Sequence, residues 1–150
     1  MSYTAAVITV SDKGYIGQRE DTSGPNLCRI LKENGYELVY TGLVPDDSEM
    51  IQAELIKCCD ELKVNLILTT GGTGFSPRDI TPEAMRAESM RITPKGCLSR
   101  SAAGIRKQSL IINLPGSKKA SEENILAVIG AVGHGLEMLL GSGSADCAAK

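Results

Sequence analysis

A glycine- and threonine-rich segment has the composition of a phosphate-binding site. It runs from Thr69 to Gly74 as TTGGTG and follows an apolar run that ends at Leu68. Glycines let backbone N–H groups approach a phosphate, and the hydroxyls of Thr70 and Thr73 could add donors. The segment has neither the Gly-Lys-Ser/Thr ending of a Walker A loop nor a GxGxxG pattern. The glycines alone support phosphate binding and a tight turn without a ligand equally well.

Two aspartates, Asp46 and Asp79, are candidates for metal-assisted chemistry. Asp79 follows the glycine segment beside Arg78, and Asp46 follows a different predicted strand. A carboxylate near a phosphate site needs a cation between the two, and Mg²⁺ is the usual cation because it binds a few carboxylates, water and phosphates. Such a pair suits attack at a phosphorus centre. For each residue alone, a helix cap is the commoner role, and Asp79 could also pair with Arg78.

Alternating elements must position these residues. Strands are predicted over residues 5–10, 37–44, 64–68 and 109–114, and the apolar run over residues 5–10 is nearly continuous. A helix capped by Thr22 or Ser23 follows the first strand and ends at residues 34–35. Order of this kind favours a single α/β domain, a three-layer sandwich whose mostly parallel central sheet carries helices on both faces. We place the domain at residues 1–140 and a flexible tail at 141–150.

Two further helices are predicted from apolar residues at helical spacing. One begins after Asp46 and Asp47. Ser121 is predicted to cap the last helix, with acidic residues near its positive end. The apolar stripe of the first of these helices contains Ile51, Leu55, Cys58, Cys59 and Leu62.

Polar segments follow four of the predicted strands. They are Ser11-Asp12, Pro45-Asp46-Asp47, Thr70–Gly74 and Asn113–Ser117. Ligands of open parallel sheets bind beyond the carboxyl ends of the strands. These segments therefore predict one convergent site.

Composition excludes several classes of protein. The net charge of −2 and the 3% aromatic content disfavour a nucleic-acid partner. No apolar run approaches the roughly 20 residues of a membrane span, and no signal peptide is visible, so we expect a cytoplasmic protein without a membrane partner. The five cysteines have no metal-binding spacing and are expected to be reduced thiols. Lone His134 is expected on a helix surface or in helix packing, so Ser-His-Asp hydrolysis is disfavoured.

Residues 68–83, which include the glycine segment and Asp79, resemble the signature of the molybdenum-cofactor biosynthesis domain family. The family contains molybdopterin adenylyltransferases, their non-adenylylating relatives and the G domains of gephyrin. Three further stretches agree with its pattern in the same order. These are residues 10–12 with 20–25, residues 44–47, and residues 98–100 through 112–117.

The resemblance implies an α/β fold, a homotrimer, and transfer of AMP from Mg-ATP to the terminal phosphate of molybdopterin with release of pyrophosphate. It matches the essential aspartates of the family to Asp46 and Asp79, which would hold Mg²⁺. It also implies a molybdenum-insertion protein as a partner. The nucleotide and pterin site that it implies consists of Ser11, Asp12, Thr70, Gly71, Gly72, Thr73, Gly74, Ser99, Asn113, Pro115, Gly116 and Ser117.

One departure from the family pattern lies after Pro82-Glu83-Ala84, which continues directly into Met85. The family has a longer helix and a Pro-Gly turn there. The segment is either absent or disordered and left out of the sequence. We favour disorder, because the junction removes part of the rim near Asp79 while both flanks are preserved. Two alternatives to adenylyl transfer stay open: a non-catalytic molybdopterin-binding or scaffolding protein, and a nucleotide pyrophosphatase.

Overall fold

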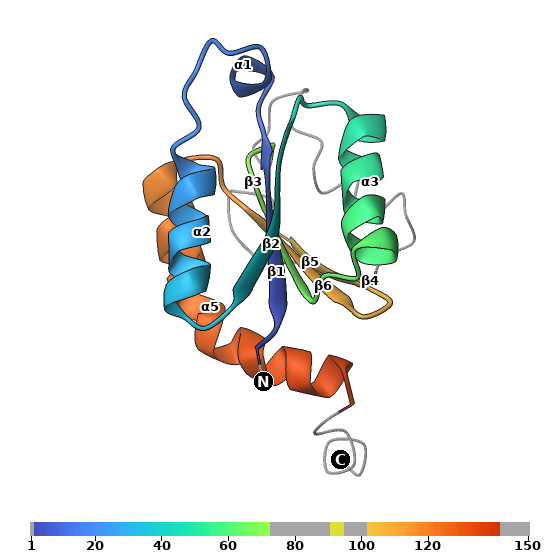
Figure 1. Cartoon of the computed structure of the whole chain (residues 1–150). Helices are drawn as coiled ribbons and strands as arrows, with labels where there is room; N and C mark the ends of the chain where they lie inside the picture. The colour runs from blue at the N-terminus through green and yellow to red at the C-terminus, as the bar shows by residue number, and fades with distance from the viewer. Residues whose placement is uncertain (1, 73–90, 95–101, 142–150) are drawn as a thin grey trace.

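A sheet with helices on both faces forms the core of the computed structural model, which describes residues 2–72, 91–94 and 102–141 (Figure 1). Its strands are β1 (Thr4–Val10), β2 (Glu37–Val44), β3 (Leu66–Thr70), β4 (Arg91–Pro94), β5 (Ala102–Arg106) and β6 (Ser109–Leu114). Its helices are α1 (Asp12–Tyr15), α2 (Ser23–Glu33), α3 (Ser48–Ile56), the π-helical turn η1 (Lys57–Glu61) and α5 (Lys118–Leu139). The predicted three-layer α/β fold is confirmed.

The six strands have the order β2-β1-β3-β6-β5-β4. The first four are parallel, and β5 and β4 continue the sheet in antiparallel fashion. Thr9 of β1 pairs with Thr70 of β3, which pairs with Leu114 of β6. The carboxyl ends of these strands therefore lie at one edge of the sheet. Strands β4 and β5 were not predicted, because the Ala-Ala-Gly start of β5 lacks the long apolar run of a buried strand.

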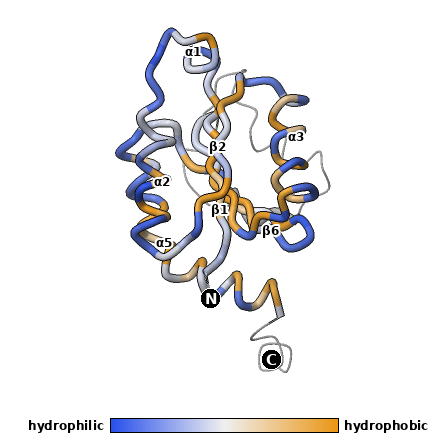
Figure 2. Tube along the Cα trace, viewed as in Figure 1, coloured by the Kyte–Doolittle hydropathy of each residue, from blue (hydrophilic) through white to orange (hydrophobic). Residues whose placement is uncertain are grey.

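The sheet separates two hydrophobic clusters. Helices α2 and α5 cover one face and α3 covers the other (Figure 1). Alternate residues of β1 enter opposite clusters: Ile8 packs on the α3 side and Val7 on the α2 side. Figure 2 shows hydrophobic colour along the strands and a hydrophilic connection between α1 and α2. Burial on both faces explains why β1 is almost entirely apolar.

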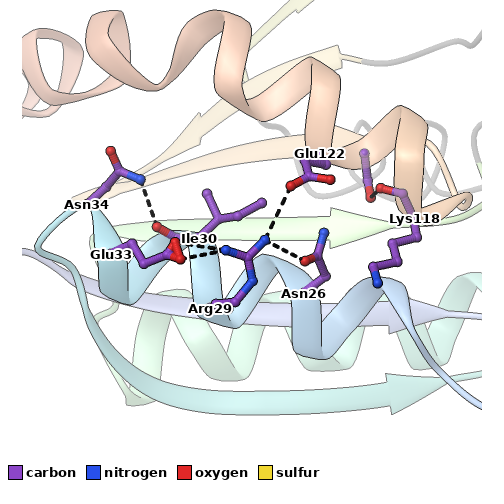
Figure 3. A network of polar contacts seen from close by, with 8 residues as sticks. Asn26, Arg29, Ile30, Glu33, Asn34, Lys118 and Glu122 are labelled. Atoms are coloured by element: carbon purple, nitrogen blue, oxygen red, sulfur yellow. Dashed lines mark hydrogen bonds and ion pairs between the residues drawn. The ribbon is translucent and has the colours of Figure 1, made fainter.

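Polar contacts join the two helices that share a face. Arg29 of α2 donates to Glu122 of α5 over 3.2 Å, and on its own helix it contacts Asn26 (2.8 Å) and Glu33 (2.8 Å) (Figure 3). The Arg29 side chain is about half exposed (53%). Solvent screens such pairs, so apolar packing contributes most to holding α2 against α5.

The β5–β6 hairpin packs against η1. Arg106 donates to Asp60 over 2.9 Å, and this hydrogen bond holds the pKa of the Asp60 carboxyl below its usual range. Gln108 donates to the carbonyl of Cys59 over 2.6 Å. Burial raises the pKa of the Cys58 thiol to about 12, so this thiol stays protonated at neutral pH. The described cysteines, Cys28, Cys58 and Cys59, are free, as expected.

Three predictions about the elements are wrong: the bounds of one strand, the burial of Leu62 and the cap of the last helix. The third strand covers Leu66–Thr70, two residues later than predicted, so Thr69 and Thr70 belong to the strand. Leu62 is 43% exposed, because η1 changes the helical register before it. Ser117, and not Ser121, caps α5: the Ser117 hydroxyl accepts from Ala120 N, whereas Ser121 is buried within the helix.

The start of α5 was not predicted because its first two residues are lysines. Lysines are unfavourable at the positive end of a helix, so Lys118 and Lys119 give no sign of a helix start. The helix nevertheless begins one turn earlier than predicted, capped by Ser117 in the loop that was expected to bind ligand. Among the described residues, none of the helices is long and apolar enough to cross a membrane.

Candidate functional site

A cavity of about 650 Å³ lies at the carboxyl ends of β1 and β3. Its wall is formed by the ends of these strands, by α1 and the connection to α2, and by the start of α5. The lining residues are Thr9, Val10, Ser11, Asp12, Lys13, Gly14, Arg19, Glu20, Asp21, Thr22, Ser23, Asp46, Thr70, Gly71, Gly72, Gly116 and Ser117. Eight of the residues predicted for the site are among them, so the predicted convergence at this sheet edge occurs.

Asp46 lies in this cavity and is only 9% exposed. Its carboxylate Oδ2 accepts from the backbone N–H of Asp12 over 3.3 Å. In return, Asp12 Oδ1 accepts from the backbone N–H of Asp46 over 3.0 Å. The two aspartates, 34 positions apart in the sequence, are therefore joined by reciprocal backbone–side-chain hydrogen bonds.

The neighbouring Asp47 has the ordinary role of a helix cap. Its Oδ1 accepts from Met50 N over 2.9 Å at the start of α3. The Asp46 carboxylate instead contacts the start of α1. Helix capping of α3 thus explains Asp47 and not Asp46.

Ser11 starts α1 at the same edge. Its hydroxyl accepts from Gly14 N over 3.0 Å, and its own N–H donates to Val44 O over 2.9 Å. The polar turn expected after β1 is therefore a short capped helix. The backbone pairing with Val44 holds Asp12 next to the segment that carries Asp46.

The glycine segment lies close to the end of β1. Gly71 has φ +104°, and a Cβ built on it would lie 2.2 Å from the carbonyl oxygen of Val10. Gly72 also has a positive φ, of 68°. A side chain at position 71 would collide with backbone, so glycine is required there by conformation and by space. Thr70 lines the cavity, but its hydroxyl donates to the Pro115 carbonyl over 2.7 Å.

The connection before α2 is part of the site that sequence reasoning left out. Asp21 accepts from the Thr9 hydroxyl (2.8 Å) and from Gly24 N (2.9 Å), so its side chain bonds the first turn of α2 and ties it to β1. The prediction that Thr22 or Ser23 would supply this side-chain cap is wrong. Ser23 donates to the Gly116 carbonyl over 2.6 Å and joins α2 to the loop before α5. Residues 20–25 are part of the pattern that resembles the family, and this resemblance could have assigned them to the site.

Two of the predicted binding residues do not line the cavity. Asn113 is fully buried and donates to the Thr69 hydroxyl over 2.9 Å, on the same face of the sheet as Ile8 of β1. Pro115 presents its carbonyl to Thr70. Thr73, Gly74, Asp79 and Ser99 lie outside the described residues, as does the junction between Ala84 and Met85. The predicted meeting of Asp46 with Asp79 therefore stays a prediction.

The donor chemistry of the cavity suits a hard cation. Its potential ligands are carboxylate and hydroxyl oxygens, including those of Asp46, and Mg²⁺ prefers oxygen ligands. Within the described ranges, no group of three or more His, Cys, Asp or Glu side chains is placed to hold a metal ion. Mg²⁺ commonly takes one or two protein carboxylates and completes its shell with water and substrate phosphates. Lys13 and Arg19 in the same wall add positive charge suited to an anionic ligand. His134 lies elsewhere, exposed on α5.

Comparison with known proteins adds to this geometry. Residues 6–134 match the family described as "Probable molybdopterin binding domain". The molybdopterin adenylyltransferase of Helicobacter pylori is 40% identical, over 91% of this chain and 87% of the relative. That of Escherichia coli K12 is 36% identical, over 85% and 74%. The crystal structure of the molybdopterin biosynthesis enzyme MoaB from Thermus thermophilus is 38% identical and superposes with a TM-score of 0.88, covering 93% of this chain and 97% of that one.

The same comparison bears on the shortened segment. The alignment with the Helicobacter pylori relative extends over 154 positions while it takes in 91% of the 150 residues of this chain. The relative therefore carries residues that have no counterpart here. The sequence joins Ala84 directly to Met85. The comparison does not give the place of those residues, so disorder of the segment after Ala84 stays a prediction.

Proposed function

Because this chain belongs to the molybdopterin-binding domain family, we propose that it is an adenylyltransferase that transfers AMP from ATP to molybdopterin. The observation that carries the proposal is the cavity at the carboxyl edge of the sheet, where the buried carboxylate of Asp46 faces the same space as the Gly71-Gly72 turn. An oxygen ligand for a cation and a glycine turn for phosphates in one cavity suit phosphorus chemistry.

The proposed reaction exchanges one phosphorus–oxygen bond for another. A terminal phosphate oxygen of molybdopterin attacks the α-phosphorus of ATP. The new oxygen–phosphorus bond joins AMP to molybdopterin, and the bond from the α-phosphorus to the bridging oxygen breaks. Pyrophosphate leaves with the electron pair of that bond. Positioning of the two phosphates and neutralisation of their charge supply most of the rate in such transfers.

The residues of the cavity have distinct proposed roles. The backbone N–H of Gly72 binds a phosphate oxygen, while that of Gly71 holds the turn by donating to the Leu114 carbonyl over 3.0 Å. The cationic side chains of Lys13 and Arg19 offset the negative charge of the two substrates. Asp46, with Asp79, would hold Mg²⁺. When bound, this ion offsets charge on the phosphates. The burial of Asp46 leaves its carboxylate little contact with bulk solvent.

Further properties belong to the same proposal. We propose a homotrimer, a cytoplasmic location, and delivery of the adenylylated product to a molybdenum-insertion protein. Thr73, Gly74 and Ser99 complete the proposed nucleotide and pterin site together with Gly72, Lys13 and Arg19.

The decisive experiment measures pyrophosphate release by the full chain with molybdopterin, ATP and Mg²⁺. Asp79→Asn and Asp46→Asn should each lower the rate at least about 100-fold, because each removes a negative charge that would hold Mg²⁺ beside the phosphates. Thermal unfolding should show that both variants keep the fold. Asp47→Asn is the matched control, because asparagine also caps helices and Asp47 lies outside the cavity lining.

The outcomes separate the candidate functions. Pyrophosphate release at the wild-type rate by Asp79→Asn would contradict the proposed role of Asp79 in holding Mg²⁺. Pyrophosphate release that does not depend on molybdopterin would indicate a nucleotide pyrophosphatase. Binding of molybdopterin without any release of pyrophosphate would indicate a non-catalytic member of the family.

A further inference from the structure

Asp12 and Asp46 connect two carboxylate-bearing segments of the cavity wall. Each donates its backbone N–H to the carboxylate of the other, over 3.3 Å and 3.0 Å. Asp12 is the first residue of α1, and Asp46 lies in the turn between β2 and α3. The reciprocal bonds thus fix the distance between two segments that meet at this edge of the sheet.

Backbone hydrogen bonds shape the turn that carries Asp46. Asp47 N donates to Pro45 O over 2.8 Å, which closes a tight turn around Asp46. Ser11 N donates to Val44 O and ends the pairing of β1 with β2 just before that turn. Beyond this point, the bond from Asp46 N to Asp12 Oδ1 orients the peptide of Asp46 relative to β1.

The bond from Asp12 N to Asp46 Oδ2 determines where the Asp46 carboxylate points. Oδ2 accepts from Asp12 N, so one oxygen of the carboxylate is held against the start of α1. This restricts rotation of the side chain and hence the place that its other oxygen occupies. A carboxylate that must meet a cation and a phosphate within a few tenths of an ångström benefits from such restriction, because misplacement by about 1 Å can cost about 100-fold in rate.

We propose that Asp12 is a positioning residue for Asp46, acting through the oxygen that accepts the Asp46 N–H rather than through its negative charge. The proposal rests on the proposed function in that Asp46 is taken to act on the phosphates. It differs from the resemblance, which assigns Asp12 directly to nucleotide or pterin binding. The chemical distinction is clear: asparagine at position 12 keeps the accepting oxygen and loses the charge, whereas alanine loses both.

The test compares Asp12→Asn with Asp12→Ala in the full chain. We expect Asp12→Asn to keep kcat within about threefold of wild type, and Asp12→Ala to lower kcat by about 10- to 100-fold. The KM for ATP should change less than about threefold in both, because neither substitution removes a group that binds ATP in this proposal. Asp47→Asn controls for loss of a neighbouring charge and should behave as wild type.

A second measurement needs no substrate. Amide hydrogen exchange followed by NMR reports the Asp46 N–H in the free protein. Protection of this amide should persist in Asp12→Asn and fall at least about 10-fold in Asp12→Ala, while amides at the centre of β1 keep their protection. This readout stands even if wild type proves inactive, so failure of the proposed function and failure of the positioning role can be told apart.

Several results would overturn the positioning role. An equal loss of kcat in both variants would show that the charge of Asp12 itself is required. Wild-type kcat in Asp12→Ala, or an unprotected Asp46 amide in wild type, would show that the bond does not position Asp46. If Asp12→Ala does not fold, the kcat of Asp12→Asn and the hydrogen exchange of the Asp46 amide in wild type decide the question. A loss of kcat above about 10-fold in Asp12→Asn contradicts the proposal.

Discussion

Asp46 and Asp47 are adjacent in sequence and have different structural roles. Asp47 caps α3 through its bond to Met50 N, whereas Asp46 is buried in the cavity and bonded to Asp12. Aspartate at either position suits a helix start, so composition alone could not separate them. The separation depends on a contact with Asp12, 34 positions away, and no local pattern contains that information.

Tyr40 offers a prediction at the same scale about pH. Its hydroxyl donates to Glu54 over 2.6 Å, and this hydrogen bond raises the pKa of Tyr40 from 10 to about 12. Because folding raises this pKa, the interaction stabilises the protein fully below pH 10 and is lost as pH rises from 10 through about 12. Tyr40→Phe should therefore lower the free energy of unfolding by about 1 kcal/mol at about pH 8.

Urea unfolding of both proteins at about pH 8 and at about pH 11 checks this expectation. The difference between Tyr40→Phe and wild type should be smaller at the higher pH. A difference that stays constant or grows with pH would contradict the assignment of the hydrogen bond. Absorbance titration of tyrosinate should also lose its highest-pH step in the variant.

Among the elements, the end of β3 has the strictest local requirement. Gly71 has a φ of +104°, and a Cβ built on it would lie 2.2 Å from the carbonyl oxygen of Val10. Gly71→Ala should lower the free energy of unfolding by at least about 2 kcal/mol, because the new Cβ is strained and meets backbone. In α5, Gly130 has open space around it, and Gly130→Ala should raise stability by roughly 0.5–1 kcal/mol.

Chemical denaturation of the two alanine variants measures both values under identical conditions. A neutral Gly71→Ala variant would mean that the turn after β3 readily adopts another conformation. A destabilised Gly130→Ala variant would mean that this face of α5 packs against a neighbour.

The regular elements differ in how far the sequence could predict them. Strands β1, β2 and β6 were predicted within a residue at either end, because apolar runs of this length bounded by polar turns are typical of strands in a sheet. The start of α5 was missed by one turn, since Ser117 follows a Pro-Gly pair and precedes two lysines. Strands β4 and β5 complete the sheet through pairing with β6, and such non-local pairing leaves little trace in a short segment.

At the scale of the whole molecule, the sequence predicted that polar segments meet at one edge of the sheet. It did not predict which residues line the cavity there. Parallel strands must end at a common edge, so Ser11, Asp46 and Gly71 were expected together. The strands do not determine the path of the α1–α2 connection, and this connection brings Arg19 and Asp21 into the wall. Conversely, Asn113 alternates onto the opposite face of β6 from Leu114 and is buried there.

The proposed homotrimer makes a prediction of molecular mass. Sedimentation equilibrium of the full chain should yield three times 15.9 kDa. The result should be independent of concentration in the micromolar range if the subunits associate tightly. A mass of 15.9 kDa at all concentrations would rule out the trimer and would leave the chemistry of the cavity untouched.

The division of the apolar interior by the sheet has a consequence for how the protein can change. Leu55 on one side and Leu31 on the other are both fully buried, and they belong to separate clusters. When two substituted residues lie in separate clusters without contact, their effects on the free energy of unfolding add. Each side can therefore diverge on its own, while the row of strand ends between them keeps the same geometry.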